Sequence, residues 1–236
     1  MKKGFTLAEV LITLGIIGVV AALTLPTLIA NYQKTQYVAG LKKAYTQLNQ
    51  VLKQMAADNG CINDLKCTGL FAAGTNSQSL GDEVVKYFKV IKNCGTTEQG
   101  CFSNHININY DGSSVSFYNW DATQYYRFIT TDGISFSIYN WGNNCQANYS
   151  TGALGYMTQL CGYVYIDVNG LNKKPNNYGR DIFGVWITNG KGASLYPEGG
   201  RDDNWNHWWS NNFCFPSNRL GTCTGRIMEN GWEMDY

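Results

Sequence analysis

The sequence predicts an α+β protein in which one long N-terminal helix packs on an antiparallel β-sheet head with large, disulfide-closed loops. Three observations support this prediction. An apolar run near the N-terminus passes into a stretch of helical periodicity that reaches residue 59. Short strand-like runs between turn signals follow it. All eight cysteines of the chain lie in this later part.

The first element is an apolar segment long enough to cross a bilayer. Residues 10–25 carry no charge, and with their apolar flanks they reach the roughly 20 residues that a spanning helix needs. Lys2 and Lys3 precede the segment and should keep the N-terminus on the cytoplasmic side. Glu9 lies near the start of the segment, where a charged side chain costs about 2.5–3.5 kcal/mol on insertion scales. We therefore expect Glu9 to have a function.

Three ordinary interpretations of this segment fit less well. A cleaved secretory signal peptide could end at the Val-Ala-Ala of residues 20–22, but Glu9 interrupts the segment and apolar sequence continues to Ile29. A lipoprotein anchor needs an early cysteine, and the first cysteine here is Cys61. A plain signal anchor leaves Glu9 unexplained.

Residues 2–9, Lys-Lys-Gly-Phe-Thr-Leu-Ala-Glu, resemble the N-terminus of type IV prepilins and type II secretion pseudopilins. The shared pattern is a short basic leader ending in Gly4, then Phe5, a glutamate at the fifth position after the glycine, and an apolar stretch. Pro26 falls where many members carry a helix-bending proline. The resemblance implies that a prepilin peptidase cuts after Gly4 and N-methylates Phe5.

Such a cleavage would give Glu9 a partner. It creates an amine on Phe5 with an unperturbed pKa of about 8, and N-methylation leaves that amine basic. When subunits pack helix against helix, Glu9 of one can meet the Phe5 amine of another. Two unit charges about 4 Å apart attract by roughly 4 kcal/mol at an effective dielectric constant of 20. The alternative is a glutamate that snorkels to the membrane interface from near a helix end.

The second half of the helix, residues 31–59, is amphipathic, and Gly60 supplies a stop after it. A helix over residues 6–59 would be about 80 Å long, and Pro26 should bend it. Gly15 and Gly18 either allow close helix packing or are ordinary transmembrane glycines. The apolar residues of the second half recur at steps of three and four, giving one face that can dock on a sheet: Val38, Leu41, Tyr45, Leu48, Leu52 and Met55.

The head is poor in charge and rich in Asn, Gly, Tyr and Trp. Asp111-Gly112 and Asp132-Gly133 are favourable hairpin turns, so residues 111–139 suggest an antiparallel meander. The head is long enough for one core. The strand-like runs are residues 106–110, 115–118, 126–130, 134–139, 163–168 and 182–188. At the C-terminus, residues 226–236 resemble the ending of many pseudopilin-like heads, where Ile227 and Trp232 would close the sheet.

The cysteines indicate an oxidising compartment. With the head outside the cytoplasm, disulfides are the default, and zinc is disfavoured because Cys-x-x-Cys is absent and histidine is scarce. The sequence does not choose among the possible pairings. Some cysteines could instead be free buried thiols. We expect sequential pairing: Cys61–Cys67, Cys94–Cys101, Cys145–Cys161 and Cys214–Cys223.

The strongest motif of the head is Ile-Asp-Val-Asn-Gly at residues 166–170, which returns through Gly-Arg-Asp-Ile-Phe at residues 179–183. It resembles a segment common in pseudopilin-like heads, some of which bind calcium in a loop. Asp167, Asn169 and Asp181 offer the oxygen ligands that calcium prefers, although the full EF-hand pattern is absent. No cofactor is required, and calcium is the candidate. The alternative is an Asx turn, in which these side chains bond their own backbone.

No catalytic constellation stands out, and we expect no enzymatic activity. His105 and His207 each lie beside Asn rather than in a triad motif. Residues 199–203 lack the ending of a phosphate loop and fit a turn. The aromatic cluster of residues 205–209 fits packing within the head better than a surface that binds sugar or protein. The net charge of +1 becomes −1 if Lys2 and Lys3 are removed, which argues against strong nucleic-acid binding.

We therefore divide the chain into a leader peptide (1–4), a transmembrane and assembly helix (5–30), an amphipathic helix (31–59) and an extracytoplasmic head (60–236). The expected function is a structural subunit of a type IV pilus or type II secretion pseudopilus. Its expected location is the bacterial inner membrane and then a filament. Expected partners are other subunits, prepilin peptidase, the membrane and an inner-membrane assembly platform. The alternatives are a tip adhesin that binds a surface or secretion substrate, and an exported enzyme on a signal anchor.

Overall fold

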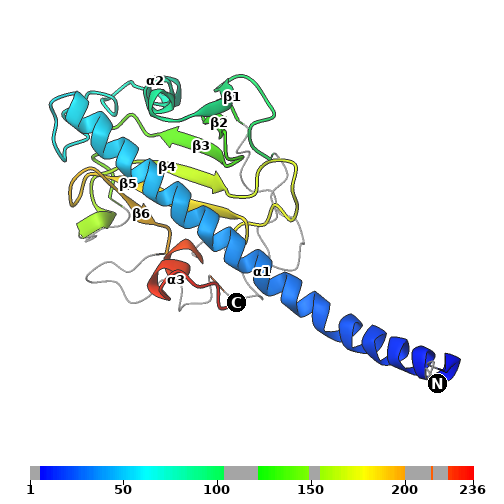
Figure 1. The fold of residues 1–236 in the computed structure, drawn as a ribbon. Helices are drawn as coiled ribbons and strands as arrows, with labels where there is room; N and C mark the ends of the chain where they lie inside the picture. Colours follow the sequence, from blue (N-terminus) through cyan, green and yellow to red (C-terminus); the bar gives the residue numbers. More distant parts are fainter. Residues whose placement is uncertain (1–5, 104–121, 149–154, 200–213, 215–222) are drawn as a thin grey trace. The chain divides into compact units, whose positions relative to one another are not determined.

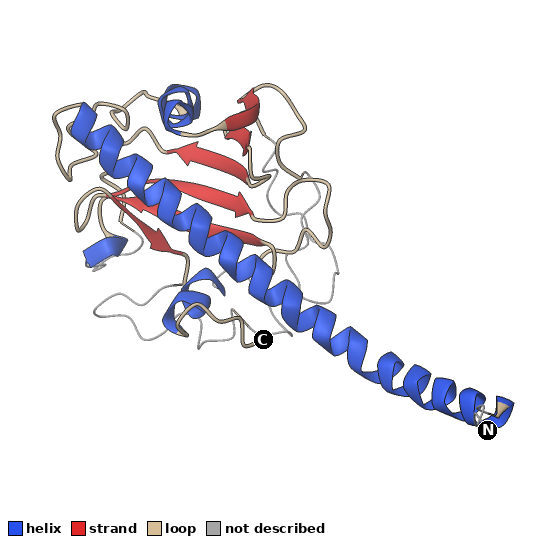
Figure 2. Cartoon of the chain, in the orientation of Figure 1, coloured by secondary structure: helices blue, strands red, loops and turns tan. Residues whose placement is uncertain are grey.

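A computed structural model describes residues 6–103, 122–148, 155–199, 214 and 223–236. The chain divides into two compact units, residues 1–36 and 37–236. Figures 1 and 2 show the elements, which confirm an α+β fold. They are helices α1 (Leu7–Asp58), α2 (Ser77–Val84) and α3 (Cys223–Glu229), strands β1 (Val90–Gly95), β2 (Tyr126–Thr130), β3 (Ser135–Asn140), β4 (Leu160–Asp167), β5 (Ile182–Thr188) and β6 (Ser194–Pro197), and two 3-10 turns, Val85–Tyr87 and Gly155–Met157.

The described part of the first unit is helical. Helix α1 continues through Pro26. The hydroxyls of Thr13 and Thr24 donate to the carbonyls of Glu9 and Val20, both at 2.9 Å, so the helix satisfies these polar groups itself. Among the described residues, α1 is the one helix long and apolar enough to cross a membrane. Its large exposed apolar side chains are Leu7, Val10, Leu11, Ile12, Leu14, Ile16, Ile17, Val19, Val20, Leu23, Leu25, Leu28 and Ile29.

The second unit is built on a six-stranded antiparallel sheet in the order β1-β2-β3-β4-β5-β6. Asp132 and Gly133 join β2 to β3 as predicted, and Gly133 has a positive φ of 82° and donates to Thr130 O at 2.9 Å. Four of the strand-like runs correspond to β2, β3, β4 and β5. The other two, residues 106–110 and 115–118, lie outside the described residues, as does the turn at Asp111-Gly112. Strands β1 and β6 were not predicted.

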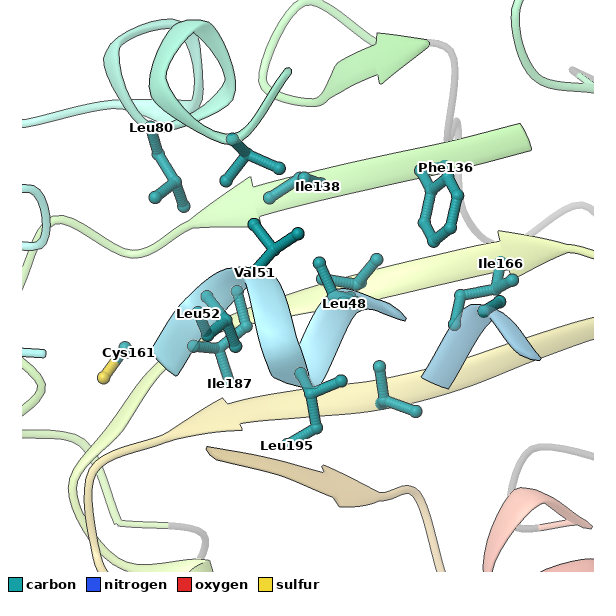
Figure 3. Packing of buried hydrophobic residues seen from close by; sticks show 14 of the residues in the cluster. Leu48, Val51, Leu52, Leu80, Phe136, Ile138, Cys161, Ile166, Ile187 and Leu195 are labelled. Atoms are coloured by element: carbon teal, nitrogen blue, oxygen red, sulfur yellow. The ribbon is translucent and has the colours of Figure 1, made fainter. Parts of the chain in front are cut away.

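Residues 37–58 of α1 cross one face of this sheet (Figure 1). The predicted apolar stripe is confirmed: Val38, Leu41, Leu48, Leu52 and Met55 are buried, and partly buried Tyr45 donates its hydroxyl to Leu195 O at 2.9 Å. Fully burying one such apolar side chain contributes about 1.5–3 kcal/mol, so this contact is a main source of head stability. Figure 3 shows the stripe meeting inward-facing residues of the sheet, among them Phe136, Ile138, Ile166 and Ile187.

The C-terminal segment covers the sheet as a helix rather than adding a described strand. Ile227 of α3 is fully buried in the core. The Gly225 amide donates to Glu198 O at 2.8 Å, which ties α3 to the end of β6. After α3, the Trp232 ring meets Tyr45 of α1 edge-on, with ring centroids 6.0 Å apart. Ile227 and Trp232 therefore close the core from outside the sheet.

All eight cysteines lie within the described residues, and none is free. The bridges join cysteines that are consecutive among the eight, the same sequential pairs that the sequence suggested. Cys214–Cys223 fastens the start of α3, and Cys145–Cys161 ties a loop to β4. The other two bridges are Cys61–Cys67 and Cys94–Cys101.

A carboxylate with no cationic partner among the described residues lies at the end of β6. Glu198 is partly buried as a residue, but its Oε2 atom accepts hydrogen bonds from the hydroxyls of Tyr163 and Tyr178, both of which are buried. Burial raises the pKa of Glu198 to about 8, against which the hydrogen bond from Tyr163 acts only partly. The native state therefore binds a proton at Glu198 more tightly than the unfolded chain does.

This carboxyl predicts a pH dependence of stability. Because the native pKa is raised from 4.5 to about 8, its favourable contribution is complete below pH 4.5 and is lost as pH rises through 8. The free energy of unfolding of the wild-type chain in detergent should fall by about 1–3 kcal/mol between pH 5 and 8.5 relative to Glu198→Gln. Denaturant titrations at both pH values measure this, with exposed Glu98→Gln as the control. Parallel profiles for wild type and Glu198→Gln would contradict it.

Candidate functional site

The first candidate site is the carboxylate of Glu9, which the start of α1 itself holds. The Thr6 amide and hydroxyl donate to Glu9 Oε2 at 2.8 and 2.9 Å, and the Glu9 amide donates back to Thr6 Oγ1 at 3.3 Å. This is a capping box, in which two residues of the first turn satisfy each other's polar groups. Gly4 and Phe5, the predicted processing residues, lie outside the described residues.

Both capping hydrogen bonds to the Glu9 carboxylate end on the same oxygen atom. That atom is Oε2, and Oε1 accepts no hydrogen bond from any of the described residues. Glu9 is exposed, and apolar side chains surround it along the helix. The site can therefore present one carboxylate oxygen to a cation outside its own helix.

The second candidate site is the loop between β4 and β5, which brings two carboxylates together. Asp167 ends β4 and pairs in register with Ile182, the first residue of β5. The Val168 amide donates to Asp181 O at 2.9 Å, which closes the base of the loop. Asp167 and Asp181 are both fully buried. Strand pairing thus places two of the three predicted calcium ligands side by side.

Backbone donors hold both carboxylates. Asp181 accepts from the amides of Asn177 and Asn176 at 2.7 and 2.8 Å. It also accepts from the Asn169 side chain at 3.0 Å, which brings in the third predicted ligand. Asp167 Oδ1 accepts from the amides of Asn169 and Gly170 at 3.2 and 2.8 Å. These are bonds of the Asx-turn type, so that interpretation of the motif describes part of the loop.

The hydrogen bonds do not offset the burial of two negative charges. Burial, and next the negative charge of Asp181, raise the pKa of Asp167 to about 7. Burial likewise raises the pKa of Asp181, while its amide and Asn169 hydrogen bonds oppose the rise. A cation beside these groups would relieve the same repulsion that raises these pKa values.

Several oxygen atoms of this region are buried without a hydrogen-bond partner. They are Asp167 Oδ2, Asn169 Oδ1 and Asn176 Oδ1 of the loop and Ser135 Oγ of β3, the residue paired with Asp167 across the sheet. An unsatisfied buried polar group costs about 1–3 kcal/mol, so a cation that bonded to these oxygens would stabilise the folded state. Oxygen atoms from carboxylates, amides and hydroxyls are a donor set for a hard cation such as calcium.

Two of these candidate cation ligands, Asn176 and Ser135, were not predicted from the sequence. Asn176 lies in the Pro-Asn-Asn stretch inside the motif, so its residue type was a usable signal. Ser135 lies 32 positions before Asp167 in the chain, and only the β3–β4 register brings the two together. Among the described residues no group of three or more His, Cys, Asp or Glu could hold a metal ion, so the set has two carboxylates and otherwise neutral oxygens.

Other residues from the sequence analysis cannot be placed. His105, His207 and the aromatic cluster at residues 205–209 lie outside the described residues. Of residues 199–203 only Gly199 is described, and its φ of 75° is typical of a turn.

Comparison with known families finds a match at the N-terminus. Residues 1–25 match the family model of the prokaryotic N-terminal methylation motif. This motif is the prepilin-type signature of type IV pilins and pseudopilins, and here it covers the leader, Glu9 and the apolar start of α1. No curated protein and no solved structure matches the chain.

Proposed function

We propose that this chain is a structural subunit of a type IV pilus or a type II secretion pseudopilus, cut after Gly4 and assembled through the first part of α1. The observation that supports this most is the methylation motif at residues 1–25, which includes most of the exposed apolar part of α1. Such a motif implies processing by a prepilin peptidase and assembly with other subunits. A structural role also needs no catalytic group.

The exposed apolar surface of residues 7–29 fits both a membrane and the interior of a filament. In the membrane, lipid covers these side chains. The helix pairs its own backbone N–H and C=O groups, which is necessary because the bilayer core offers no water to bond them. In a filament, the same side chains pack on the corresponding helices of other copies. An inner-membrane assembly platform would move the subunit from the first environment to the second. The four disulfides of the head support a periplasmic or extracellular location for it.

Glu9 would make the move from the membrane into the filament depend on prior cleavage of the leader. Before assembly, the capping box with Thr6 satisfies one carboxylate oxygen. After cleavage, the new amine of Phe5 on a neighbouring subunit can approach the other oxygen. The ion pair then offsets the cost of carrying a carboxylate among apolar side chains.

A minor subunit at the tip is the finer alternative. The head of this chain is large and carries four bridges, which suits a tip-located binding module better than a bulk, repeated subunit. Labelling filaments with antibody to the head separates the two roles: label along the shaft indicates a bulk subunit, and label confined to one end indicates a tip.

The first prediction concerns processing. Gly4→Val should leave a full-length precursor, because the peptidase then lacks its glycine at the cleavage site. Mass spectrometry should find no N-methylated Phe5 in this variant. Gly15→Ala is the matched control, since an added Cβ there meets nothing within 4 Å. Normal maturation of Gly4→Val would overturn the proposal.

The second prediction separates the charge of Glu9 from its capping role. Glu9→Gln keeps an oxygen that accepts from Thr6, and Gln completes a capping box as Glu does. The variant should therefore insert and be processed, but its incorporation into filaments should fall about tenfold or more through loss of the ion pair. Glu9→Ala, which loses both roles, should be at least as impaired. Filaments of Glu9→Gln in wild-type amounts would refute the ion-pair account.

We also propose that the β4–β5 loop binds a divalent cation, most favourably calcium, through Asp167, Asn169 and Asp181 with Asn176 and Ser135. The buried oxygens without partners are the specific observation that favours this second role. It is independent of assembly through α1, so either proposal can fail alone.

For the cation site, calcium should raise the thermal midpoint of the full chain in detergent, and a chelator should reverse the rise. At a calcium concentration 100 times the Kd the gain is about 2.7 kcal/mol. Asp167→Asn should raise the midpoint in chelator, because it removes one of two repelling charges, and should abolish the calcium response. Glu98→Gln should respond as wild type does. Equal midpoints of the wild-type chain in calcium and chelator would exclude the site.

A further inference from the structure

Helix α1 lies against the loop of the proposed cation site at the first residues of the second unit. Gly40 is where they meet: a Cβ added to it would lie 3.0 Å from Val168 Cβ and 3.5 Å from Val168 O. Val168 directly follows Asp167, and its amide donates to Asp181 O. The absence of a side chain at Gly40 therefore lets the helix seat on the backbone that connects the two carboxylates.

Tyr37 makes a second link one turn earlier on the same helix. Its side chain is 7% exposed. Burial, followed by the negative charge of Asp181, raises the pKa of Tyr37, and Asp167 adds to the effect. This effect on Tyr37 agrees with the contact of Gly40 and Val168 one turn later on the same helix.

The β2–β3 turn makes the third link. A Cβ added to Gly170 would lie 2.6 Å from Gly133 O, so the loop packs tightly on this turn. Lys43 Nζ of α1 forms an ion pair with Asp132 Oδ2 of the same turn at 2.7 Å. Ser135, one of the candidate donors, begins the strand that follows. The helix, the loop and the turn therefore contact one another around the proposed site.

We propose that a divalent cation in the β4–β5 loop acts as a clasp that fastens residues 37–43 of α1 to the sheet. This inference rests on the cation site proposed above and adds its consequence. Without the cation, the two buried carboxylates repel and loosen the base of the loop on which Gly40 rests. With the cation bound, the loop is rigid and the helix is held.

Coupling of this kind is reciprocal. If the cation stabilises helix docking, then a change that disturbs docking must weaken cation binding by the same factor, even at a residue that is no ligand. Gly40→Val is such a change, because its side chain would displace Val168. Ala39→Val is the matched control, since Ala39 is the adjacent residue of α1 and is exposed.

The test combines hydrogen exchange and calorimetry on the full chain in detergent, with calcium chloride as the probe. Calcium should slow exchange of the amides of residues 37–43 by about tenfold, within the usual range of coupling effects, and leave residues 50–58 unchanged. Gly40→Val should bind calcium about tenfold more weakly than wild type, and Ala39→Val should bind as wild type does.

The outcomes separate the two proposals. No calcium binding by the wild-type chain would remove the site and the clasp together. Binding with unchanged exchange at residues 37–43 would overturn the clasp and leave the site standing. The exchange measurement uses only the wild-type chain, so it decides the matter even if Gly40→Val does not fold.

Discussion

The structure depends on how the apolar surface of one helix is covered. Helix α1 has 52 residues, and from Val38 to Ala56 its apolar stripe is buried under the sheet. From Leu7 to Ile29 its large apolar side chains are exposed. Because burying one such side chain contributes about 1.5–3 kcal/mol, the second group must also find cover. The head supplies that cover for one half of the helix. Under the proposed function, lipid or other copies of the chain would supply it for the other half.

This constraint explains why a carboxylate is tolerated at the start of the helix. Thr6 satisfies one oxygen of Glu9 within the same turn, so the isolated subunit is not left with a wholly unpaired charge. A neighbouring Phe5 amine exists only after cleavage at Gly4. The order of events, which is insertion, cleavage and then lateral packing, would therefore follow from which partner Glu9 has available at each stage.

Sequence patterns predicted the elements whose signal is local. The stripe from Val38 to Met55 has the period of a helix. Asp132-Gly133 is a dipeptide typical of a hairpin turn, and β2 to β5 are short strand-like runs. Strand β1 was not predicted because it has several consecutive exposed residues and two register shifts, so its sequence does not alternate between polar and apolar residues. Strand β6 has four residues and ends in Pro197. Of the two candidate ligands that were not predicted, Asn176 lies inside the motif and its residue type was a usable signal. Ser135 could be recognised only from the β3–β4 register.

In the proposed filament, Glu9 keeps Thr6 on one carboxylate oxygen and pairs the other with the Phe5 amine of another subunit. Filaments assembled from two pools of subunits test it directly, one labelled with ¹³C at the Glu9 carboxyl and the other with ¹⁵N at Phe5. Solid-state NMR should detect dipolar coupling between the two labels at a distance of about 4 Å, as expected for an ion pair. Filaments that form normally but show no coupling between the pools would contradict the account.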